Sequence, residues 1–442
     1  MSNDKEVKVH VGTKSKTIHV DYLARVEGEG ALFIKTHGDT VEDVKLKIFE
    51  PPRFFEALLR GRDLSDAPDI TARICGICPV AYQMSSVYAM ENALGVEVPE
   101  YLHQLRRLLY CGEWIESHTL HVYLLHAPDF LGYPDAIQMS QDYKDAMQRG
   151  LRIKKAGNDI IALIGGREIH PINVKVGGFY QLPKKAQLLK LVEPLLQARS
   201  EAKETLLWVN QFQFPQMDKH YECVSLFHPD EYPIARGQIA ATSHLKISAQ
   251  EYENYFEEIH VPHSTALHSR LKTKGSYLVG PIARYNLNRE KLPPLVQDAI
   301  TEIGFEKQCT NPFRSIIVRA LEILYACDEA LRIIDAYDAD YLPSSVALVK
   351  RKAIGYAATE APRGLLYHRY RLNEEGLIEE AKITPPTSQN QKIIEEDLFE
   401  FVSRNLSMPD QQLQHRCEQA IRNYDPCISC SAHFLKLTRQ NG

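Results

Sequence analysis

The sequence predicts a mainly α-helical protein with small β-sheets, which is an α+β fold. Over long stretches in the middle of the chain, apolar residues recur every three or four positions, as is typical of helices. Period-two alternation is clear only in a short region near the N-terminus. The 442 residues are 44% hydrophobic and contain neither an internal repeat nor a low-complexity linker. We therefore expect one mostly helical body rather than a string of separate domains.

Strand signals mark the start of the chain. Residues 17–50 alternate between apolar and polar side chains, and the pair Gly38 and Asp39 has the composition of a hairpin turn. We expect residues 1–70 to form a β-containing lobe.

Three long apolar stripes predict the helical body, which we place at residues 71–350. They cover residues 99–126, 188–209 and 313–334. The second stripe should kink near Pro194, because proline has no amide proton and its ring clashes with the carbonyl four residues earlier. Asn311 and Pro312 are typical of a helix start, with the asparagine as cap and the proline in the first turn.

Residues 351–433 are expected to form a mixed C-terminal segment. A hairpin turn is predicted at 373–376 and a final helix at about 410–423, and residues 434–442 follow as a short tail.

Charge and hydropathy narrow the class of protein. The formal net charge is −5 and no block of basic residues stands out, which argues against nucleic acid as the main partner. The N-terminal residues contain no apolar core of a secretory signal. No apolar run reaches the roughly 18 residues that a transmembrane segment needs. We therefore expect a cytoplasmic protein without a transmembrane segment.

Four of the nine cysteines form two Cys-x-x-Cys pairs, Cys75 with Cys78 and Cys427 with Cys430. Each pair can bind one metal through two thiolates on a single turn. The pairs lie near opposite ends of the chain, whereas a zinc ribbon brings its pairs within about 15–20 residues of each other. A thioredoxin-type redox pair would need a βαβ pattern that neither pair shows. Residue chemistry alone leaves open a four-thiolate site for zinc, copper, nickel or iron–sulfur chemistry.

The stretches around these cysteines resemble a known family. RICGICP (73–79) and DPCISCSAH (425–433) are similar to the two metal-binding signatures of the large, catalytic subunit of nickel–iron hydrogenases. LARVEGEG (23–30), EAPRG (360–364) and GGREIHPINVKVGGF (165–179) resemble further motifs of that family, in the same order. The resemblance implies the large-subunit fold, built round a bundle of long helices. The likeness is greatest to the cytosolic NAD(P)-linked multisubunit type.

The resemblance implies a nickel–iron centre that cleaves H2 heterolytically and reversibly. Cys75 and Cys427 would be terminal ligands of nickel. Cys78 and Cys430 would bridge the nickel to an iron that carries CO and two cyanides.

The same resemblance implies further roles close to the metals. The base is either the Cys427 thiolate or the Arg363 guanidine, and Glu27 would accept the proton first from Cys427. Asp425 matches an acidic residue over the active site, and Thr387 matches a hydroxyl that donates a hydrogen bond to a cyanide. Without the cysteine pairs, these side chains would be interpreted as ordinary turn, hairpin and capping residues.

A magnesium ion is also implied. Its ligands would be Glu56, the backbone carbonyl of Ile383, and His433, although by spacing alone His433 could equally bind zinc or iron. The sequence departs from the family pattern at Tyr82, where many members have histidine, and at Ser117, where many have an acidic residue.

Electrons are expected to leave through partner subunits, since the chain has neither a cysteine cluster of the kind that binds a cubane nor a nucleotide-binding fingerprint. The partners would be an iron–sulfur small subunit and flavin-containing NAD(P) reductase subunits. Alternatives are a hydrogenase with a deazaflavin or quinone-linked acceptor, an H2 sensor, and a non-enzymatic subunit with a structural zinc–S4 site.

The resemblance predicts that a maturation protease removes residues 434–442 once nickel is bound, so that the active protein ends at His433. The intact mass of the nickel-loaded protein should equal that of residues ending at His433. An active species of full length would contradict this expectation.

Overall fold

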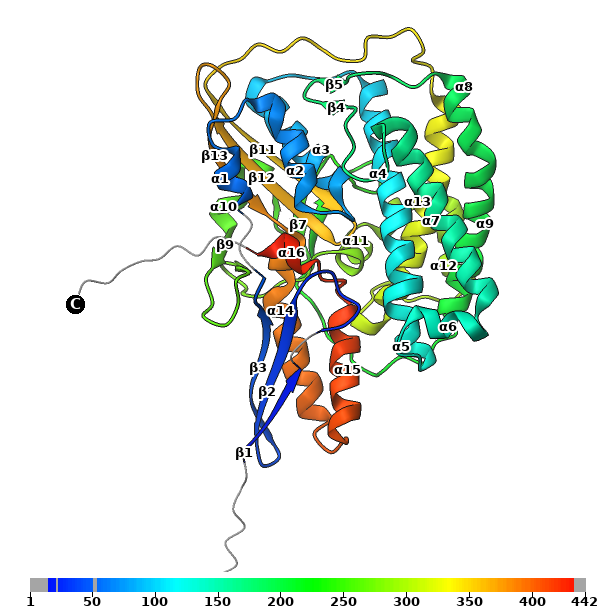
Figure 1. The fold of residues 1–442 in the computed structure, drawn as a ribbon, viewed down its shortest axis with the longest axis vertical. Coiled ribbons are helices and arrows are strands. Elements are labelled where there is room, and N and C mark those ends of the chain that lie inside the picture. Colours follow the sequence, from blue (N-terminus) through cyan, green and yellow to red (C-terminus); the bar gives the residue numbers. More distant parts are fainter. Residues whose placement is uncertain (1–14, 21–22, 51–53, 433–442) are drawn as a thin grey trace, which may run out of the picture.

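The structure is a computed structural model that describes residues 15–20, 23–50 and 54–432. It is mostly helical, with small antiparallel sheets at one side of a helical bundle (Figure 1), which confirms the predicted fold class. One cluster of buried apolar side chains extends from Val20 in the first strand to Cys430 near the C-terminus. None of the described helices combines the length and the apolar content that crossing a membrane requires.

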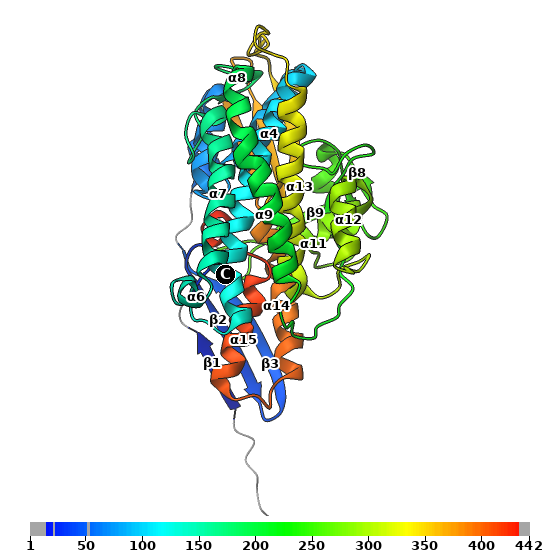
Figure 2. The same cartoon turned by 90° about the vertical axis from the view of Figure 1, so that its right-hand side faces the viewer.

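Four long helices form the bundle: α4 (Glu100–Leu120), α7 (Lys144–Gly165), α9 (Val192–Val209) and α13 (Ser315–Ala336). They run side by side in both views (Figures 1 and 2), with α4 packed on α7 and α13 packed on both α4 and α9. The helices α4 and α7 meet at two glycines. A Cβ atom on Gly157 would lie 2.6 Å from the carbonyl oxygen of Gly112, so only glycine allows this backbone approach.

The predicted helix boundaries are largely confirmed. The helix after Pro99 begins at Glu100 and continues beyond α4 as a π-helical segment, His121–His126. The Asn311 side chain accepts a hydrogen bond from the Phe313 amide at 3.0 Å and caps the turn that leads into α13.

The second stripe is interrupted before its proline. A short helix α8 (Lys185–Leu188) is followed by a 3-10 turn, Leu189–Leu191, and then by α9. Pro194 has no amide proton for the carbonyl of Lys190, which lies in that turn. The expected kink is therefore a short break in the helix.

The N-terminal sheet consists of β1 (Ser15–Val20), β2 (Gly30–His37) and β3 (Thr40–Ile48), in antiparallel order. Gly38 and Asp39 form the predicted turn, with Gly38 at φ +58°. The C-terminal helix α14 (Pro386–Arg404) packs against this sheet, where it contacts β3.

A second three-stranded sheet lies against α3 (Pro79–Leu94). Its strands are β11 (Ala353–Ala361), β12 (Gly364–Leu372) and β13 (Ile378–Thr384), and the turn predicted at 373–376 joins the last two. Between β11 and β12 the chain reverses over only two residues, because Ala361 pairs with Gly364. The tip of this hairpin therefore carries the APRG motif.

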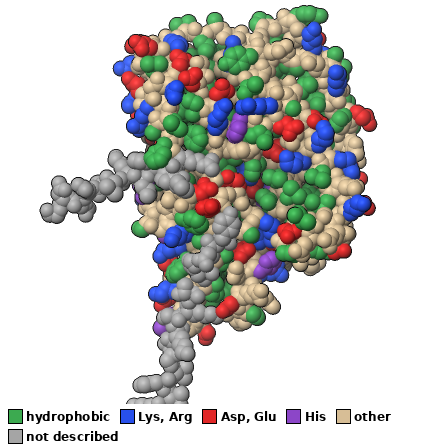
Figure 3. Space-filling model, viewed as in Figure 1, with side chains coloured by type: hydrophobic (Ala, Val, Ile, Leu, Met, Phe, Trp, Pro, Cys, Tyr) green, Lys and Arg blue, Asp and Glu red, His purple; other side chains and the backbone are tan. Residues whose placement is uncertain are grey.

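The remaining described elements are short. The helix predicted at about 410–423 is α15, and one further short helix, α16, follows it. The helices are α1 (Phe55–Leu59), α2 (Ala67–Thr71), α5 (Ala127–Leu131), α6 (Ala136–Asp142), α10 (Tyr252–Tyr255), α11 (Pro281–Asn288), α12 (Pro294–Glu302), α15 (Asp410–Arg422) and α16 (Ile428–Ser431). The strands are β4 (Val174–Lys175), β5 (Gly178–Phe179), β6 (Val224–Phe227), β7 (Gln238–Ala241), β8 (Lys246–Ile247), β9 (Phe256–Ile259) and β10 (His268–Leu271). On the face shown in Figure 3, acidic and basic side chains are interspersed.

The glycine contact between α4 and α7 predicts a loss of stability for Gly157→Val. The new side chain would press on backbone atoms, and overpacking of this kind costs about 1–3 kcal/mol. For a chain of this length we expect the midpoint of thermal unfolding to fall by about 1–3 °C. Lys155→Val, on the exposed face of α7, is the matched control and should change the midpoint less. Equal midpoints for the two variants would show that the helices do not meet at these glycines.

Candidate metal centre

The structure brings the two cysteine pairs together. Cys75 follows a 3-10 turn and Cys78 directly precedes α3, while Cys427 and Cys430 lie at the start of α16 and within it. All four are buried, and their sulfur atoms lie within 4.8 Å of one another. The Cys75 sulfur is 2.8 Å from that of Cys78 and 3.6 Å from that of Cys427. Segments from opposite ends of the chain thus converge on one point, as the sequence predicts.

The chemistry of this donor set fits a soft metal ion. Burial opposes ionisation of Cys75, but the hydrogen bond from Cys78 and the charge of Arg363 outweigh it and lower the pKa of Cys75 below the ordinary value. The hydrogen bond to Cys75 and burial raise the pKa of Cys78. The sulfur atoms of Cys427 and Cys430 are in contact with each other, and a metal would need both as thiolates. Four buried thiolates repel one another unless a cation lies between them, and thiolates suit nickel, zinc and iron.

Glycines in the LARVEGEG motif let the C-terminal pair approach the N-terminal segment. The Ile428 amide donates a hydrogen bond to the carbonyl oxygen of Glu27 at 2.8 Å. Gly28 has φ +89°, and a Cβ atom there would lie 2.8 Å from both Ile428 Cβ and the Ser429 amide nitrogen. The motif therefore fixes the backbone of the segment that carries Cys427.

Two polar side chains hold Cys427 itself. The Cys427 sulfur lies 3.1 Å from Glu27 Oε2, and the same oxygen accepts the Ser429 amide at 3.0 Å. From the start of α14, the Thr387 hydroxyl accepts the Cys427 amide at 3.0 Å. Glu27 thus contacts the residue that the resemblance connects it with, and Thr387, which the resemblance connects with a cyanide, contacts the backbone of the same residue.

Arg363 lies at the tip of the β11–β12 hairpin and is only 3% exposed. Its Nε donates to the backbone oxygen of Asp425 at 2.8 Å, and its Nη2 donates to Asp425 Oδ1 at 3.1 Å. Burial opposes the charge, but Asp425, the sulfurs of the first pair and Glu27 raise the pKa of Arg363. Among the described residues, its Nη1 has no hydrogen-bond partner. This buried, charged donor fits a group that accepts hydrogen bonds beside the sulfurs.

The expected magnesium ligands are brought together only in part. Glu56 Oε1 accepts a hydrogen bond from the Ile383 amide at 2.8 Å, so these two residues meet. Both line a cavity of about 500 Å³ that also reaches Cys430 and Ala432. His433 lies outside the described residues.

The two departures from the family pattern are both buried. Tyr82 lies in the first turn of α3, and burial together with the charges of Cys78 and Cys75 raises the pKa of its phenol well above the usual value. Ser117 lies on the inner part of α4. Within the part of the chain that the structure describes, neither hydroxyl has a hydrogen-bond partner.

Sequence reasoning missed residues that hold the cysteine segments from a distance. On α4, the Glu113 carboxylate accepts the amides of Val80 at 2.6 Å and Ala81 at 3.1 Å, at the start of the helix that follows Cys78. The Ser429 hydroxyl donates to Glu50 Oε1 at 2.8 Å. No local signal marks Glu113, because its partners are amides that any residue could supply.

A second group of metal-ligating side chains consists of His263, His268 and Glu395. His263 Nε2 lies 2.7 Å from Glu395 Oε1, which is hydrogen-bond distance, and the same oxygen accepts the Leu46 amide at 3.1 Å. These contacts form a hydrogen-bonded junction between β3, the segment that precedes β10, and α14.

Comparisons with known proteins agree with this site. The family described as nickel-dependent hydrogenase matches residues 53–150. Sulfhydrogenase 2 subunit alpha of Pyrococcus furiosus is 36% identical, over 95% of this chain and 100% of the relative. The NAD-reducing hydrogenase HoxS subunit beta of Cupriavidus necator is 26% identical, over 95% of each chain. The crystal structure of an NAD+-reducing NiFe-hydrogenase in the H2-reduced state matches with a TM-score of 0.87 and 25% identity, over 95% of this chain and 100% of that one.

The predicted family is thereby confirmed. The match to the Pyrococcus furiosus relative extends over nearly the whole chain, and the fold matches that of the NAD+-reducing enzyme over nearly the whole chain as well. The chain therefore belongs to the nickel–iron hydrogenases, as a large, catalytic subunit.

Proposed function

We propose that the chain is the catalytic subunit of a cytoplasmic hydrogenase that transfers electrons from H2 to NAD(P) through partner subunits. The observation that carries the proposal is the convergence of four buried sulfurs from two ends of the chain. The NAD(P) linkage is supported by two matches, the HoxS subunit of Cupriavidus necator and the structure of an NAD+-reducing enzyme.

The four cysteines would hold the metal centre. Cys75 and Cys427 would be terminal ligands of nickel, and Cys78 and Cys430 would bridge it to an iron with one CO and two cyanides. When bound, such a centre supplies a soft, electron-rich site at which H2 can be cleaved heterolytically. The Thr387 hydroxyl, which accepts the Cys427 amide, can donate its own proton to a cyanide.

Of the two candidate bases, the contacts favour the Cys427 thiolate. Arg363 is engaged with Asp425 through two nitrogens, and its pKa is raised, so its guanidinium keeps its proton. The Cys427 sulfur is 3.1 Å from Glu27 Oε2, within reach for direct proton transfer. In this assignment Glu27 receives the proton from Cys427.

Arg363 would act on the metal centre through its positive charge and through Nη1, which has no hydrogen-bond partner among the described residues. Asp425 holds the guanidinium through a carboxylate and a backbone oxygen. A fixed, buried positive charge stabilises negative charge on the neighbouring sulfurs and on ligands between them. Asp425 is thus a positioning residue for Arg363.

The cavity beside Cys430 is the proposed magnesium site. Glu56, the Ile383 carbonyl and His433 would supply its protein ligands, with water filling the other positions, as is usual for magnesium. Removal of residues 434–442 by a maturation protease would leave His433 as the C-terminal residue, directly after Ala432, which lines this cavity.

Electrons would leave through an iron–sulfur small subunit and then flavin-containing NAD(P) reductase subunits. In the described part of the chain, none of the other five cysteines belongs to a group of three or more metal-ligating side chains. An iron–sulfur partner subunit is the proposed first electron acceptor.

Metal analysis and infrared spectroscopy of the purified complex test the metal centre, and H2-dependent reduction of NAD(P)+ tests the acceptor. We expect nickel and iron in the preparation, infrared bands of CO and CN, and NAD(P)H formed under H2. Zinc without such bands would indicate a structural zinc site instead. Bands together with reduction of another acceptor only would contradict the NAD(P) linkage.

Glu27→Gln should block proton transfer from Cys427 while leaving the metal centre assembled. The amide oxygen can still accept the Ser429 amide, but it cannot carry a proton at neutral pH. We expect H2 oxidation to fall on the order of 100-fold or more, with unchanged nickel content. Glu29→Gln, two residues on and exposed, is the matched control and should keep full activity. Full activity in Glu27→Gln would refute this role.

A further inference from the structure

We propose that Arg284 is a positioning residue that holds the Pro362–Arg363 turn in place beside the four sulfurs. The proposal rests on the function proposed above for Arg363. Arg284 lies on α11 and is fully buried. Its five guanidinium hydrogen bonds go to carboxylate and carbonyl oxygens, and none of them goes to a sulfur or to the Arg363 side chain.

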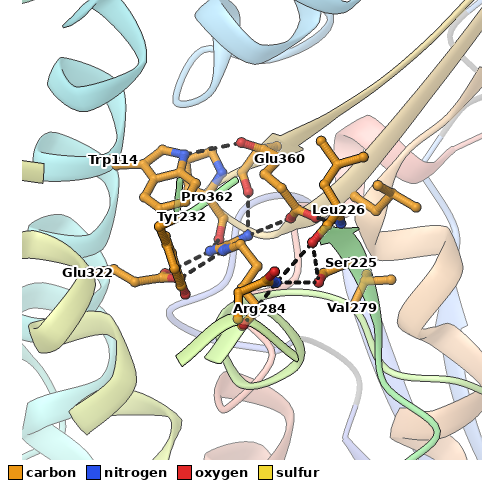
Figure 4. A network of polar contacts seen from close by, with 12 residues as sticks. Trp114, Ser225, Leu226, Tyr232, Val279, Arg284, Glu322, Glu360 and Pro362 are labelled. Atoms are coloured by element: carbon orange, nitrogen blue, oxygen red, sulfur yellow. Dashed lines mark hydrogen bonds and ion pairs between the residues drawn. The ribbon is translucent and has the colours of Figure 1, made fainter. Parts of the chain in front are cut away.

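Arg284 binds the backbone directly before Arg363. Its Nη1 donates to the carbonyl oxygen of Ala361 at 2.9 Å, and its Nη2 donates to the carbonyl oxygen of Pro362 at 2.8 Å. Figure 4 shows the guanidinium between this turn and the helical bundle. Because the hairpin reverses over only two residues, these two carbonyls fix the orientation of the peptide that carries Arg363.

All five donors of Arg284 are used. Besides the two carbonyls, Nε and Nη2 donate to the two carboxylate oxygens of Glu322, each at 2.7 Å, and Nη1 donates to Glu360 Oε2 at 3.0 Å. The Arg284 Cζ atom lies 4.4 Å from the ring centre of Trp114. A guanidinium is a rigid planar fork, so any rotation would break several of these bonds at once.

The anchors of Arg284 belong to the long helices. Glu322 lies on α13, and its Oε1 also accepts a hydrogen bond from the Tyr232 hydroxyl at 2.8 Å. His118 Nε2, from α4, lies 2.9 Å from Glu322 Oε2. The Trp114 indole donates to the carbonyl oxygen of Glu360 at 3.1 Å, again from α4 to the hairpin (Figure 4). The network therefore ties the Pro362–Arg363 turn to the long helices α4 and α13.

A backbone contact supports the same turn from the other side. A Cβ atom on Gly364 would lie 2.6 Å from the Gly280 amide nitrogen, and one on Gly280 would lie 2.8 Å from the carbonyl oxygen of Arg363. Gly280 directly precedes α11, one helical turn before Arg284. The start of α11 thus clamps the turn by backbone contact and by the guanidinium together.

The test compares Arg284→Lys with Arg106→Lys in the purified, nickel-loaded complex. Arg106 is an equally buried arginine that binds both oxygens of Glu91, at 2.8 and 2.6 Å, and these bonds do not involve the turn. Lysine keeps the charge at either position but cannot bind a carboxylate and two carbonyls in one plane.

We expect Arg284→Lys to shift the infrared bands of CO and CN and to lower kcat on the order of 10- to 100-fold, because a small displacement of Arg363 changes its contacts at the centre. Arg106→Lys should leave the band positions unchanged, even where it lowers thermal stability. Unchanged bands in Arg284→Lys, or equal shifts in both variants, would overturn the proposal.

Glu360→Gln provides a second variant, used where Arg284→Lys does not yield loaded enzyme. The glutamine replaces a carboxylate partner of Arg284 by an amide and leaves the bonds to both carbonyls possible. We expect a smaller band shift than for Arg284→Lys, and no shift would refute the positioning role. Absence of CO and CN bands in the wild-type complex would instead refute the proposed function, and the inference with it.

Discussion

The structure depends on the contact between two segments from opposite ends of the chain, residues 27–30 and 427–429. The Ile428 amide binds the Glu27 carbonyl, and the absence of a side chain at Gly28 lets the two backbones meet. This contact places the segment that carries Cys427 and Cys430 beside the N-terminal motif, with the four sulfurs within 4.8 Å of one another. Bringing four thiolates into a buried space is unfavourable without a cation between them, and the apolar core around the site helps to hold the four residues together.

The electrostatics of the site follow from that burial. Sulfurs, Glu27 and Asp425 all favour a positive neighbour, and Arg363 provides it from the tip of a hairpin. Burial opposes the charge of the guanidinium, but the negative groups around it outweigh that effect, so its pKa is raised and it keeps its charge. The charge that helps to lower the pKa of Cys75 is therefore permanent, whereas the proposed proton transfer takes place on the Cys427 side, where Glu27 lies at 3.1 Å.

Much of the fold and of the candidate site could be predicted from local sequence patterns. Apolar periodicity located α4 and α13, the pair Asn311 and Pro312 marked a helix start, and motif order led to the cysteines and to Arg363. The break before α9 was expected only as a kink, since the sequence shows where a proline lies but not how the chain relieves the clash. Glu113 and Arg284 could not be found, because the groups that they bind lie far along the chain and no local pattern connects them.

The two cysteine pairs are held by different parts of the fold. The first pair precedes α3, whose first amides are bound by Glu113 of the helical bundle. The second pair is held by Glu27 and Thr387, from the N-terminal segment and from α14. Helix α13 of the bundle also donates two side-chain hydrogen bonds to a backbone oxygen of the C-terminal segment, so the bundle contacts both parts of the site. Arg363 in turn binds Asp425 of that segment, so the contacts of the guanidinium are complete only when the C-terminal segment is in place.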